Sequence, residues 1–506
     1  GYSAGRPFEK GCLTGLSEAF MLLSDILNGI DYSCDNFKNT DIVDITYNSK
    51  NAGEGKCFFC LSGTITDGHK YARSAYDGGC RCVFAEHKVE LPEDCVQIIT
   101  DDTRHALAIA SANFFGRPCG EIKVVGITGT KGKTTTAHLT RCLLEANGHK
   151  CGIIGTNGAM YGDVHEETEN TTPESYELHK LFRKMIGAGC EYCVIEASSL
   201  GLKMHRTDGI PFEVGVFMNL APDHIGTIEH PTFEDYKNSK KILFSMCKHA
   251  VVNVDDPAYE DMLEGSSADV TSFGLGKADV SAENVELLKS KDMLGVSFDC
   301  VEADRSFHVN APIPGYFNVY NVLAAVAICK VLGVDVEGKI DALHGFRVSG
   351  RMESVHVSDD FDVIIDFAHN GLSMHNIIST LKTYPHNRIV VLYGSIGGKN
   401  QIRRKELGLT AGKEADLSVL TSDDPGAEDP AEIAEEIASY IRQVGGKYII
   451  IPDRKEAVRQ TLSQMQKGDI LVLAGKGDET FIKLKDGKVP YSEREEVEKY
   501  IKLKKN

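Results

Sequence analysis

The chain has 506 residues and a formal net charge of −18, which argues against a nucleic-acid partner because such a partner needs a basic surface. Its hydrophobic content of 42% and charged content of 25% are ordinary for globular proteins, and the length predicts about three domains. No apolar run reaches the roughly 18 residues of a membrane span, and the opening GYSAGRPFEKG lacks the apolar core of a signal peptide. We therefore expect no membrane insertion. The 15 cysteines, odd in number and scattered, favour a reducing cytoplasm.

The predicted elements fall into three segments in which apolar, strand-like runs alternate with helical patterns. The first segment opens with a helix over 16–27, followed by runs at 43–47, 57–61, 81–84 and 96–99. The second has runs at 123–127, 152–154, 192–195, 213–218 and 250–254. The third has runs at 363–367, 389–393, 417–420, 448–451 and 470–473, with a helix over 430–442.

This alternation predicts an α/β fold with helices outside mostly parallel sheets. We expect three domains: a small N-terminal α/β domain over 1–120, a central phosphate-loop domain with a parallel sheet over 121–345, and a C-terminal Rossmann-like domain over 346–506.

Four cysteines stand close together in the first segment: Cys57, Cys60, Cys80 and Cys82. Their spacing approaches a paired C-x-x-C zinc site but does not match it. Both pairs lie in strand-like runs, so we expect buried thiols, with a zinc site as the alternative.

The segment GITGTKGKTTT at 126–136 carries the clearest chemistry, because an apolar run precedes it and a helical pattern over 134–146 follows. A strand, a glycine-rich turn and a helix place backbone N–H groups and a helix N-terminus around an anion. Lys133 would reach the β- and γ-phosphates of a nucleotide, and the Thr134 hydroxyl would reach Mg²⁺. The general pattern wants glycine where this chain has Ile127, and a purely structural turn is the alternative.

Six polar clusters come directly after strand-like runs: VIEASS, FMNLAPDH, DFAHN, YGSIGGKN, TSDDPG and LAGKGDE. In open α/β sheets, ligands bind beyond the carboxyl ends of the strands. Each cluster alone could be an ordinary turn, but six in the same topological place predict a binding cleft between two domains.

The motifs of this chain, taken in order, resemble those of the Mur ligases, the ATP-dependent amino-acid ligases of peptidoglycan synthesis: GTKGKTT, NTTPES, IEASSLGLKMHR, FMNLAPDH, FEDYKNSKKILF, VNVDDP, FNVYNVLAA, SGRME, IIDFAHN, TSDDPGAEDP and LAGKGDE. The N-terminal ITYNSKNAGEGKCFFCLSGTITDGHKYARSA is similar to the UDP-binding domain of the MurE type. The resemblance implies an enzyme that activates a carboxylate with ATP, as an acyl phosphate, and joins it to an amine. We expect a monomer whose partners are ATP, an amino acid and UDP-N-acetylmuramoyl-L-alanyl-D-glutamate.

The resemblance also assigns residues to each ligand. For ATP they are Gly129, Thr130, Gly132, Lys133, Thr134 and Thr135, with Asn321 at the adenine, Asp366 at the ribose and Arg351 at the triphosphate. For the UDP-linked dipeptide they are Ser49, Thr171, Thr172, Ser198 and Arg206. For Mg²⁺ they are Thr134, Glu196, His224 and Lys240, the last as a carbamate. The catalytic set is Lys133, Glu196, His224 and Lys240. Without the family, Glu196 could be a surface turn carboxylate, His224 a helix cap or packed imidazole, and Lys240 a solvated helix lysine.

Two departures from the family pattern stand out. Leu200 takes the place of a histidine that usually follows two serines. The segment IGGKNQIRR lacks the first arginine of the GGDRD-like segment of diaminopimelate enzymes, and we expect Arg403 and Arg404 to substitute in part.

The amino acid is predicted from a third segment. Diaminopimelate enzymes carry Asp-Asn-Pro-Arg, whose arginine holds the distal carboxylate, and this chain has Asp423-Asp424-Pro425-Gly426. Glu428 and Asp429 follow closely, and an acidic pocket without that arginine favours a distal ammonium, so we expect L-lysine. The resemblance also places Gly475 and Glu479, from LAGKGDE, at the substrate. L-Ornithine, one methylene shorter, stays as an alternative because a methylene discriminates by only ~1–3 kcal/mol. meso-Diaminopimelate is a further alternative.

Other classes of protein are weighed against this interpretation. They are a folylpolyglutamate-type ligase, a nucleotide-binding regulatory paralogue without turnover, and a phosphate-loop motor or transporter ATPase. The UDP-binding resemblance argues against the first, the intact catalytic set against the second, and the acidic, non-repeated C-terminal half against the third.

Overall fold

The computed structural model describes residues 20–63, 66–223, 225–226, 229–289, 294–398 and 401–505. The chain forms two compact units: unit 1 comprises 1–279 and 324–336, and unit 2 comprises 280–323 and 337–506. Both are built from strands and helices, which confirms the predicted α/β class. Within the described ranges, no helix is both long and apolar enough to cross a bilayer.

The N-terminal part of unit 1 is a parallel sheet with the strand order β3-β4-β5-β6. Its elements are β1 (Met21–Leu22), α1 (Leu23–Ile26), β2 (Asp41–Ile42), β3 (Asp44–Thr46), η1 (Ser49–Asn51), β4 (Lys56–Phe59), η2 (Gly68–Tyr71), α2 (Ala72–Asp77), β5 (Cys82–Ala85), β6 (Val96–Ile99), α3 (Thr103–Phe114) and η3 (Pro118–Gly120). Alternate side chains of the strands point to opposite faces. Phe59 and Phe84 therefore pack with α1 and α3, whereas Phe58 and Val83 pack with α2.

Two sequence expectations can be compared with this sheet. The helix expected over 16–27 begins only at Leu23, because Met21 and Leu22 pair with β2, and residues 1–19 lie outside the described part. Cys57 on β4 lies opposite Cys82 on β5, and both thiols are buried in the sheet.

The central part of unit 1 is a larger sheet that is parallel from β8 to β14, with the order β10-β9-β8-β11-β7-β12-β13-β14. Its elements are β7 (Lys123–Thr128), α4 (Lys133–Ala146), β8 (Cys151–Gly155), β9 (Gly158–Tyr161), β10 (Val164–Glu166), α5 (Ser175–Gly187), β11 (Tyr192–Glu196), α6 (Ser199–Lys203), β12 (Phe212–Phe217), α7 (Phe233–Ser245), β13 (Cys247–Asn253), α8 (Tyr259–Leu263) and β14 (Asp269–Gly274). The five strand-like runs of the sequence all form parallel strands here, as expected. The antiparallel strands β9 and β10, of which β10 is at the edge, were not predicted.

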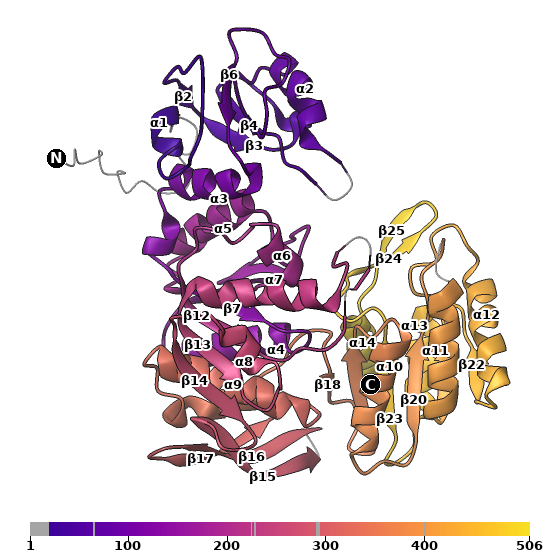
Figure 1. Ribbon diagram of the computed structural model, residues 1–506. Helices are drawn as coiled ribbons and strands as arrows, with labels where there is room; N and C mark the ends of the chain where they lie inside the picture. The colour runs from indigo at the N-terminus through magenta and orange to yellow at the C-terminus, as the bar shows by residue number, and fades with distance from the viewer. Residues whose placement is uncertain are drawn as a thin grey trace. The chain divides into compact units, whose positions relative to one another are not determined.

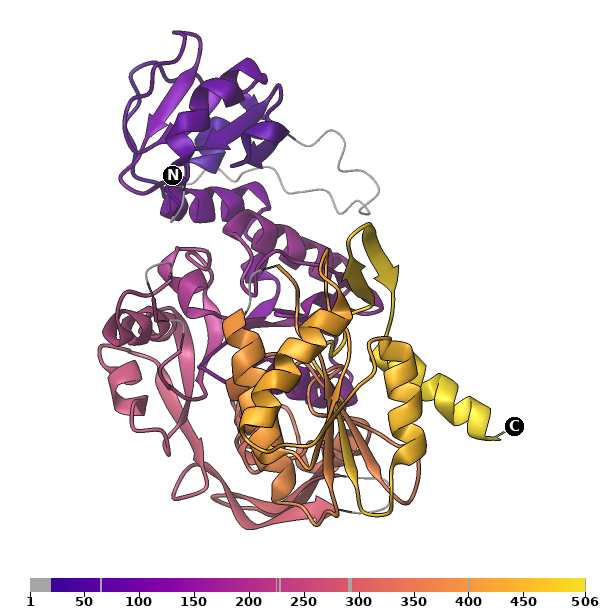
Figure 2. The ribbon, with the colours of Figure 1, turned by 90° about the vertical axis from the view of Figure 1, so that its right-hand side faces the viewer.

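Helix α3 of the N-terminal part lies beside α5 of the central part (Figure 1, Figure 2). Arg183 on α5 donates hydrogen bonds to the Phe115 carbonyl at 2.8 and 3.1 Å. The Phe115 ring contacts the Tyr176 ring with centroids 5.2 Å apart. These contacts connect the two sheets of unit 1.

Unit 2 combines an antiparallel ladder with a six-stranded, mostly parallel sheet of order β18-β19-β23-β20-β21-β22. The ladder consists of β15 (Val280–Lys289), β16 (Leu294–Glu302) and β17 (Ser306–Ala311). After it come α9 (Phe317–Val331), in which the chain returns to unit 1, and η4 (Glu337–Gly345). The remaining elements are β18 (Glu353–Val355), β19 (Asp362–Asp366), α10 (Gly371–Lys382), β20 (Ile389–Tyr393), α11 (Gln401–Glu414), β21 (Leu417–Leu420), α12 (Pro430–Gln443), β22 (Tyr448–Ile450), α13 (Arg454–Gln464), β23 (Ile470–Ala474), β24 (Phe481–Leu484), β25 (Gly487–Pro490) and α14 (Glu493–Lys505).

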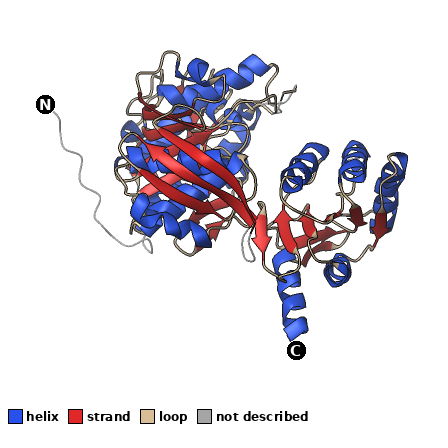
Figure 3. Ribbon diagram, turned by 90° about the horizontal axis from the view of Figure 1, so that it is seen from below, coloured by secondary structure: helices blue, strands red, loops and turns tan. Residues whose placement is uncertain are grey.

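Helices cover both faces of the six-stranded sheet (Figure 3). Val391 and Val472 pack with α10, α11 and α12, while Val390 and Leu471 pack with α13 and α14. All five strand-like runs of this segment form the parallel strands that were predicted, because strands buried on both faces read as continuous apolar runs.

A buried ion pair fixes the carboxyl edge of this sheet. Arg454 and Glu493 are both fully buried, and Nε of the arginine lies 2.8 Å from Oε1 of the glutamate. The same guanidinium donates to the carbonyls of Ser422, at 2.9 Å, and Ala474, at 2.7 Å. Arg454 therefore holds the ends of β21 and β23 together.

We predict that Glu493→Gln lowers the free energy of unfolding of unit 2 by about 3–5 kcal/mol, because it leaves a buried guanidinium without its counter-charge. Urea unfolding of the full chain measures the loss. Glu495→Gln, two residues along α14 and exposed, should change the unfolding midpoint little. Equal effects of the two substitutions would contradict the structural role of the pair.

Candidate active site

The phosphate loop connects β7, which lies between β11 and β12, to the start of α4. Gly129 has a φ of +151°, and a Cβ there would lie 2.8 Å from Cβ of Met218. Gly132 has a φ of +89° just before the helix. Both positions therefore require glycine, although Ile127 replaces the first glycine of the general pattern.

Two lysines converge on this loop. Lys133 donates to the carbonyl of Gly129 at 2.8 Å and of Thr130 at 3.3 Å. Lys240, from α7, donates to the same Gly129 carbonyl at 3.2 Å. Burial, together with the neighbouring charge of Lys133, holds the pKa of Lys240 well below its usual value. The sequence alone suggests a solvated helix lysine at Lys240, but its side chain is buried and its lowered pKa favours the neutral amine.

The Glu196 carboxylate, at the carboxyl end of β11, is 1% exposed and gathers the surrounding donors. Its oxygens accept from the Thr134 hydroxyl at 2.9 and 3.0 Å, and from the N–H and hydroxyl of Thr156 at 3.0 and 3.2 Å. A Cβ on Gly155 would lie only 2.1 Å from Oε1 of Glu196, so the carboxylate occupies space that a side chain would fill. A hydroxyl and a carboxylate side by side fit Mg²⁺, which prefers oxygen ligands.

The residues expected at the dipeptide lie at the same edge of the sheet. The Thr172 hydroxyl donates to the Glu196 carbonyl at 2.7 Å and lies 2.9 Å from Oγ of Ser198. Ser198 also caps α6, accepting from the Gly201 N–H at 3.1 Å. The hydroxyl of Thr171 lies 3.3 Å from that of Thr156. Their hydroxyls therefore form one polar surface beside Glu196.

Arg206 joins this surface through a glutamate that sequence reasoning missed. Its guanidinium donates to Oε1 of Glu174 and to the Thr172 carbonyl, both at 3.0 Å. Glu174 also pairs with Arg104 at 3.2 Å, so two guanidinium groups share one carboxylate. The cationic surface beside Thr172 suits a carboxylate or a diphosphate.

A buried imidazole stands near the serines although Leu200 replaces the usual histidine. Nε2 of His230 lies 2.9 Å from Oγ of Ser199, and its Nδ1 lies 2.7 Å from Oδ2 of Asp235. No local motif marks His230, because it reaches Ser199 across 31 residues of chain.

A cavity of 590 Å³ lies beside η1, which begins at Ser49. Asn48 and Asn51, at the two ends of η1, line it, whereas Ser49 is not among its lining residues. Tyr176 and Lys180 line it from α5. The expected UDP-binding segment therefore borders a cavity large enough for a small ligand.

The remaining nucleotide candidates are distributed over the chain. Thr130 bonds the Ala221 carbonyl at 3.2 Å, and Thr135 lies half-buried in the first turn of α4. In unit 2, Asn321 donates to Oδ1 of Asn318 at 2.7 Å. His224 lies outside the described residues.

Asp366 is the last residue of β19, and Arg351, which precedes β18 in the chain, lies beside the residue that follows Asp366. The Asp366 carboxylate accepts from the N–H groups of Met352 and Ala368, each at 2.8 Å, and burial raises its pKa. The Arg351 guanidinium lies over the Phe367 ring, 5.1 Å from its centroid.

The segments TSDDPG and LAGKGDE form one carboxylate cluster, the lysine-centred cluster of Asp423, Asp424, Glu479 and Lys476. The Lys476 ammonium is fully buried, 2.8 Å from Oδ1 of Asp424 and 3.8 Å from Oδ1 of Asp423, and it also pairs with Glu479. Burial alone would lower the pKa of Lys476, but the three carboxylates raise it. Burial raises the pKa values of Asp423 and Glu479. An ammonium of the protein thus already occupies this acidic pocket.

Glycine is required beside this cluster. A Cβ on Gly475, whose φ is +107°, would lie 2.7 Å from Oδ2 of Asp423. Gly426, with a φ of +58°, has open space where its side chain would be.

Of the two arginines expected to replace the missing one, Arg404 does not fit that role. It is buried and pairs with Glu428 at 2.8 Å and Glu436 at 2.6 Å. Arg403 is half-buried. Burial lowers the pKa of His369, the charge of Arg403 lowers it further, and Asp423 opposes the shift without reversing it. Arg403 and Asp423 thus both act on His369.

Comparisons with known proteins agree with this geometry. The Mur ligase middle domain matches residues 127–329, and the Mur ligase, glutamate ligase domain matches residues 350–477. A UDP-N-acetylmuramoyl-L-alanyl-D-glutamate--2,6-diaminopimelate ligase of Clostridium botulinum is 36% identical over 489 residues, covering 95% of this chain and 100% of the relative. The enzyme of the same name from Caldanaerobacter subterraneus is 36% identical over 483 residues, covering 95% and 99%.

Solved structures show the same similarity. The structure of a UDP-N-acetylmuramoyl-L-alanyl-D-glutamate--2,6-diaminopimelate ligase has a TM-score of 0.72 and 25% identity, covering 96% of this chain and 100% of that one. The MurF ligase of Thermotoga maritima, solved with ADP, shares the fold at a TM-score of 0.56 and 20% identity, covering 91% and 98%. The predicted architecture of an N-terminal domain, a central nucleotide-binding domain and a C-terminal domain is thereby confirmed.

We predict that Lys476→Met lowers stability by about 3–5 kcal/mol at neutral pH, because it leaves buried carboxylates without a counter-charge. The folded-state pKa values of Asp423 and Glu479 already lie above their usual 3.8 and 4.5, and the substitution raises them further. A raised acid pKa means that stability is lost as pH rises. The deficit should therefore be small near pH 4 and grow above pH 4.5, measured by urea unfolding. Lys485→Met, at an exposed lysine, should show no such pH dependence.

Proposed function

This chain belongs to the Mur ligase family of ATP-dependent amide-bond ligases, and we propose that the residues around Glu196 and the phosphate loop carry its reaction. The enzyme adds an amino acid to a UDP-N-acetylmuramoyl dipeptide in peptidoglycan synthesis. One observation supports the proposal above all. The hydroxyls of Thr134, in the phosphate loop, and of Thr156 both donate to the buried carboxylate of Glu196. The backbone carbonyl of Glu196 accepts a hydrogen bond from Thr172.

The proposed reaction has two steps. The substrate carboxylate attacks the γ-phosphorus of ATP, which releases ADP and forms an acyl phosphate. The amine of the amino acid then attacks the acyl carbon, phosphate leaves, and the amine loses a proton. Phosphoryl transfer depends mainly on positioning and charge neutralisation, so Lys133 would exchange the carbonyls of Gly129 and Thr130 for phosphate oxygens.

Thr134 and Glu196 would hold Mg²⁺, and family resemblance adds His224 and Lys240. The ion, when bound, would neutralise phosphate charge. Lys240 would serve as a carbamate: its neutral amine adds to CO₂, forming an N–C bond and releasing one proton, which yields an anionic oxygen ligand. The lowered pKa of Lys240 favours this step, because only the unprotonated amine is a nucleophile.

We predict that Lys240→Ala reduces ATP-dependent phosphate release at least ~100-fold, and that short-chain carboxylic acids restore part of it by supplying the missing carboxylate. Lys237→Ala is the matched control on the same helix, because Lys237 pairs with Asp261 on the surface. Lys133→Ala should give the background rate. Full activity of Lys240→Ala without added carboxylate would refute the carbamate.

For the added amino acid, we propose 2,6-diaminopimelate, the substrate named for the relatives at 36% identity. Its distal carboxylate needs a cation, and Arg403 is the candidate, since Lys476 and Arg404 are held in ion pairs. The distal ammonium would be received by Asp423 and Glu479.

L-Lysine is the second candidate, and Gly426 is the specific observation that favours it. The family arginine expected to hold a distal carboxylate is absent there, and Gly426 leaves open space near Asp424 and Lys483. A pocket without that arginine favours a side chain that ends in an ammonium.

A kinetic comparison separates the two candidates. For a diaminopimelate enzyme, Arg403→Ala should lower kcat/KM for diaminopimelate ~10-fold or more, the value of a charge-assisted hydrogen bond, and leave lysine use unchanged. Lys405→Ala, exposed on the same helix, is the control. Product formation is measured with both amino acids and L-ornithine. A wild-type preference for L-lysine would overturn the first candidate and support the second.

A further inference from the structure

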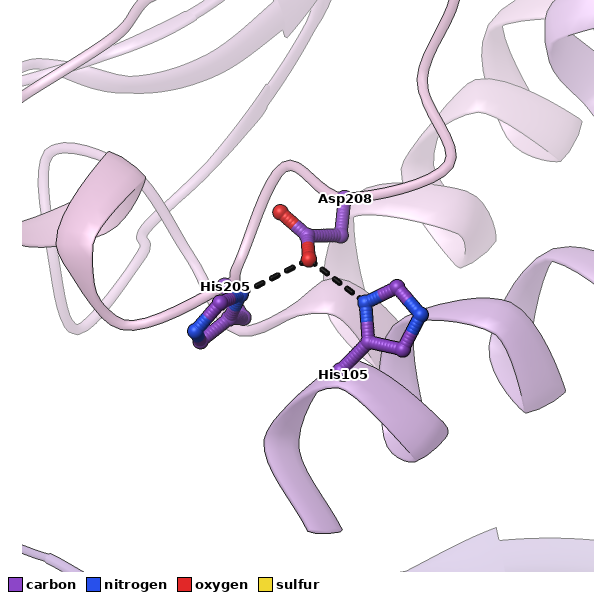
Figure 4. Close-up of side chains that lie close together, drawn as sticks. All are labelled: His105, His205 and Asp208. Carbon is purple, nitrogen blue, oxygen red and sulfur yellow. Dashed lines mark hydrogen bonds and ion pairs between the residues drawn. The ribbon is translucent and has the colours of Figure 1, made fainter. Parts of the chain in front are cut away.

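Two histidines and an aspartate form a cluster in unit 1, separate from the residues assigned to ATP and to the dipeptide. Both imidazoles point toward one carboxylate (Figure 4). Oδ2 of Asp208 lies 2.7 Å from Nδ1 of His105 and 2.7 Å from Nδ1 of His205. One ligand atom from each of the three residues lies within 4.8 Å of the other two.

Two different elements present these side chains. His105 lies in the first turn of α3, where its N–H bonds the capping carboxylate of Asp102 at 3.0 Å. His205 follows α6 with a φ of +56°, in the left-handed region that favours glycine. The Arg206 N–H closes this turn on the Gly201 carbonyl at 3.0 Å. The strained backbone of His205 is what aims its ring at Asp208.

We propose that His105, His205 and Asp208 bind a divalent first-row transition ion, with Zn²⁺ as the best-suited probe. Two imidazoles and one carboxylate form a ligand set typical of Zn²⁺ with an open fourth position. Bonds of about 2.0 Å in a tetrahedron place ligand atoms roughly 3.3 Å apart. The contacts of 2.7 Å would therefore open by about 0.6 Å as the ion replaces the shared protons.

The carboxylate of Asp102 contacts the ring of His205 on the side away from the proposed metal, as carboxylates do in many metal sites. Oδ2 of Asp102 lies 3.3 Å from Nε2 of His205, the ring nitrogen that does not face Asp208. Such a partner fixes the ring orientation and the tautomer, which leaves Nδ1 to the metal. Asp102 would thus be a positioning residue for the site.

Access and charge also suit a cation. The side chains of His105 and His205 are 51% and 40% exposed, so an ion can reach them from solvent, while Asp208 is 15% exposed. Arg104 is a cation that acts on His205, and it shares the carboxylate of Glu174 with Arg206. Asp102 and Asp208 leave the site locally anionic.

The ion would fasten α3 to the turn that carries Arg206. That arginine donates to the Thr172 carbonyl and to Glu174, so the turn borders the dipeptide surface. The metal site would be structural, distinct from the Mg²⁺ used with ATP, because Mg²⁺ prefers oxygen ligands and keeps its waters.

The test is a titration of the purified full chain, stripped of metal, with Co²⁺ and with Zn²⁺. We expect one equivalent of Co²⁺ to give the visible absorption of a four-coordinate nitrogen and oxygen site, without the near-ultraviolet band of thiolate ligation. Zn²⁺ should displace it and raise the melting temperature. A thiolate band, or only the weak spectrum of six-coordinate Co²⁺, would overturn the proposal.

Variants locate the site. His105→Ala should weaken Zn²⁺ binding at least ~100-fold and abolish the rise in melting temperature. Asp102→Asn keeps a capping oxygen for α3 but loses the acceptor for His205, and should weaken binding ~10–100-fold. His149→Ala is the matched control, because His149 also pairs with a carboxylate, Glu191 at 3.1 Å. Binding by His105→Ala equal to that of wild type would refute the site.

Discussion

A carboxylate buried at the end of a parallel strand is the constraint on which the site in unit 1 depends. Glu196 is removed from water, and a buried charge costs several kcal/mol unless hydrogen bonds compensate it. The donors come from the first turn of α4 and from the turn after β8. The positions of the phosphate loop and of the Thr156 turn are therefore set by one side chain, and Gly155 makes the space for it.

In unit 2 the buried charges that organise the sheet edge are cations, and acceptor groups surround them. Arg454 holds the carbonyl ends of β21 and β23, and Lys476 gathers the carboxylates that follow these strands. The two strands come from distant parts of the sequence, yet their polar ends must meet at one point. Side chains with several donors suit this task, because each can satisfy groups from different segments at once.

Much of the fold could be predicted because its signals are local. Apolar runs predicted the parallel strands, and the glycines at 129 and 132 predicted the phosphate loop. The ladder of β15 to β17 was missed, since Val280–Lys289 is rich in Glu, Leu and Lys, which favour helices, and pairing with β16 overrides that preference.

The site was predicted less completely, for a related reason. Glu174, His230 and Lys476 find their partners through tertiary contacts, which no local spacing reveals. L-Lysine was predicted from the missing arginine and the acidic residues of TSDDPGAEDP, whereas Lys476, from the later segment LAGKGDE, pairs with Asp423 and Asp424. The relatives at 36% identity are named as 2,6-diaminopimelate ligases, and the comparisons do not confirm L-lysine.

The Gly129 carbonyl, which both Lys133 and Lys240 share, has a consequence for the turnover cycle. A lysine already hydrogen-bonded to its own loop does not have to be ordered when a nucleotide arrives, so little conformational entropy is lost at that moment. The same carbonyl competes with phosphate for the ammonium, and part of the binding energy of the nucleotide is consumed in that exchange. Once the terminal phosphate has gone, the carbonyl can reclaim the lysine. If Lys133 binds the terminal phosphate as proposed, the loop would thereby favour the departure of the spent nucleotide.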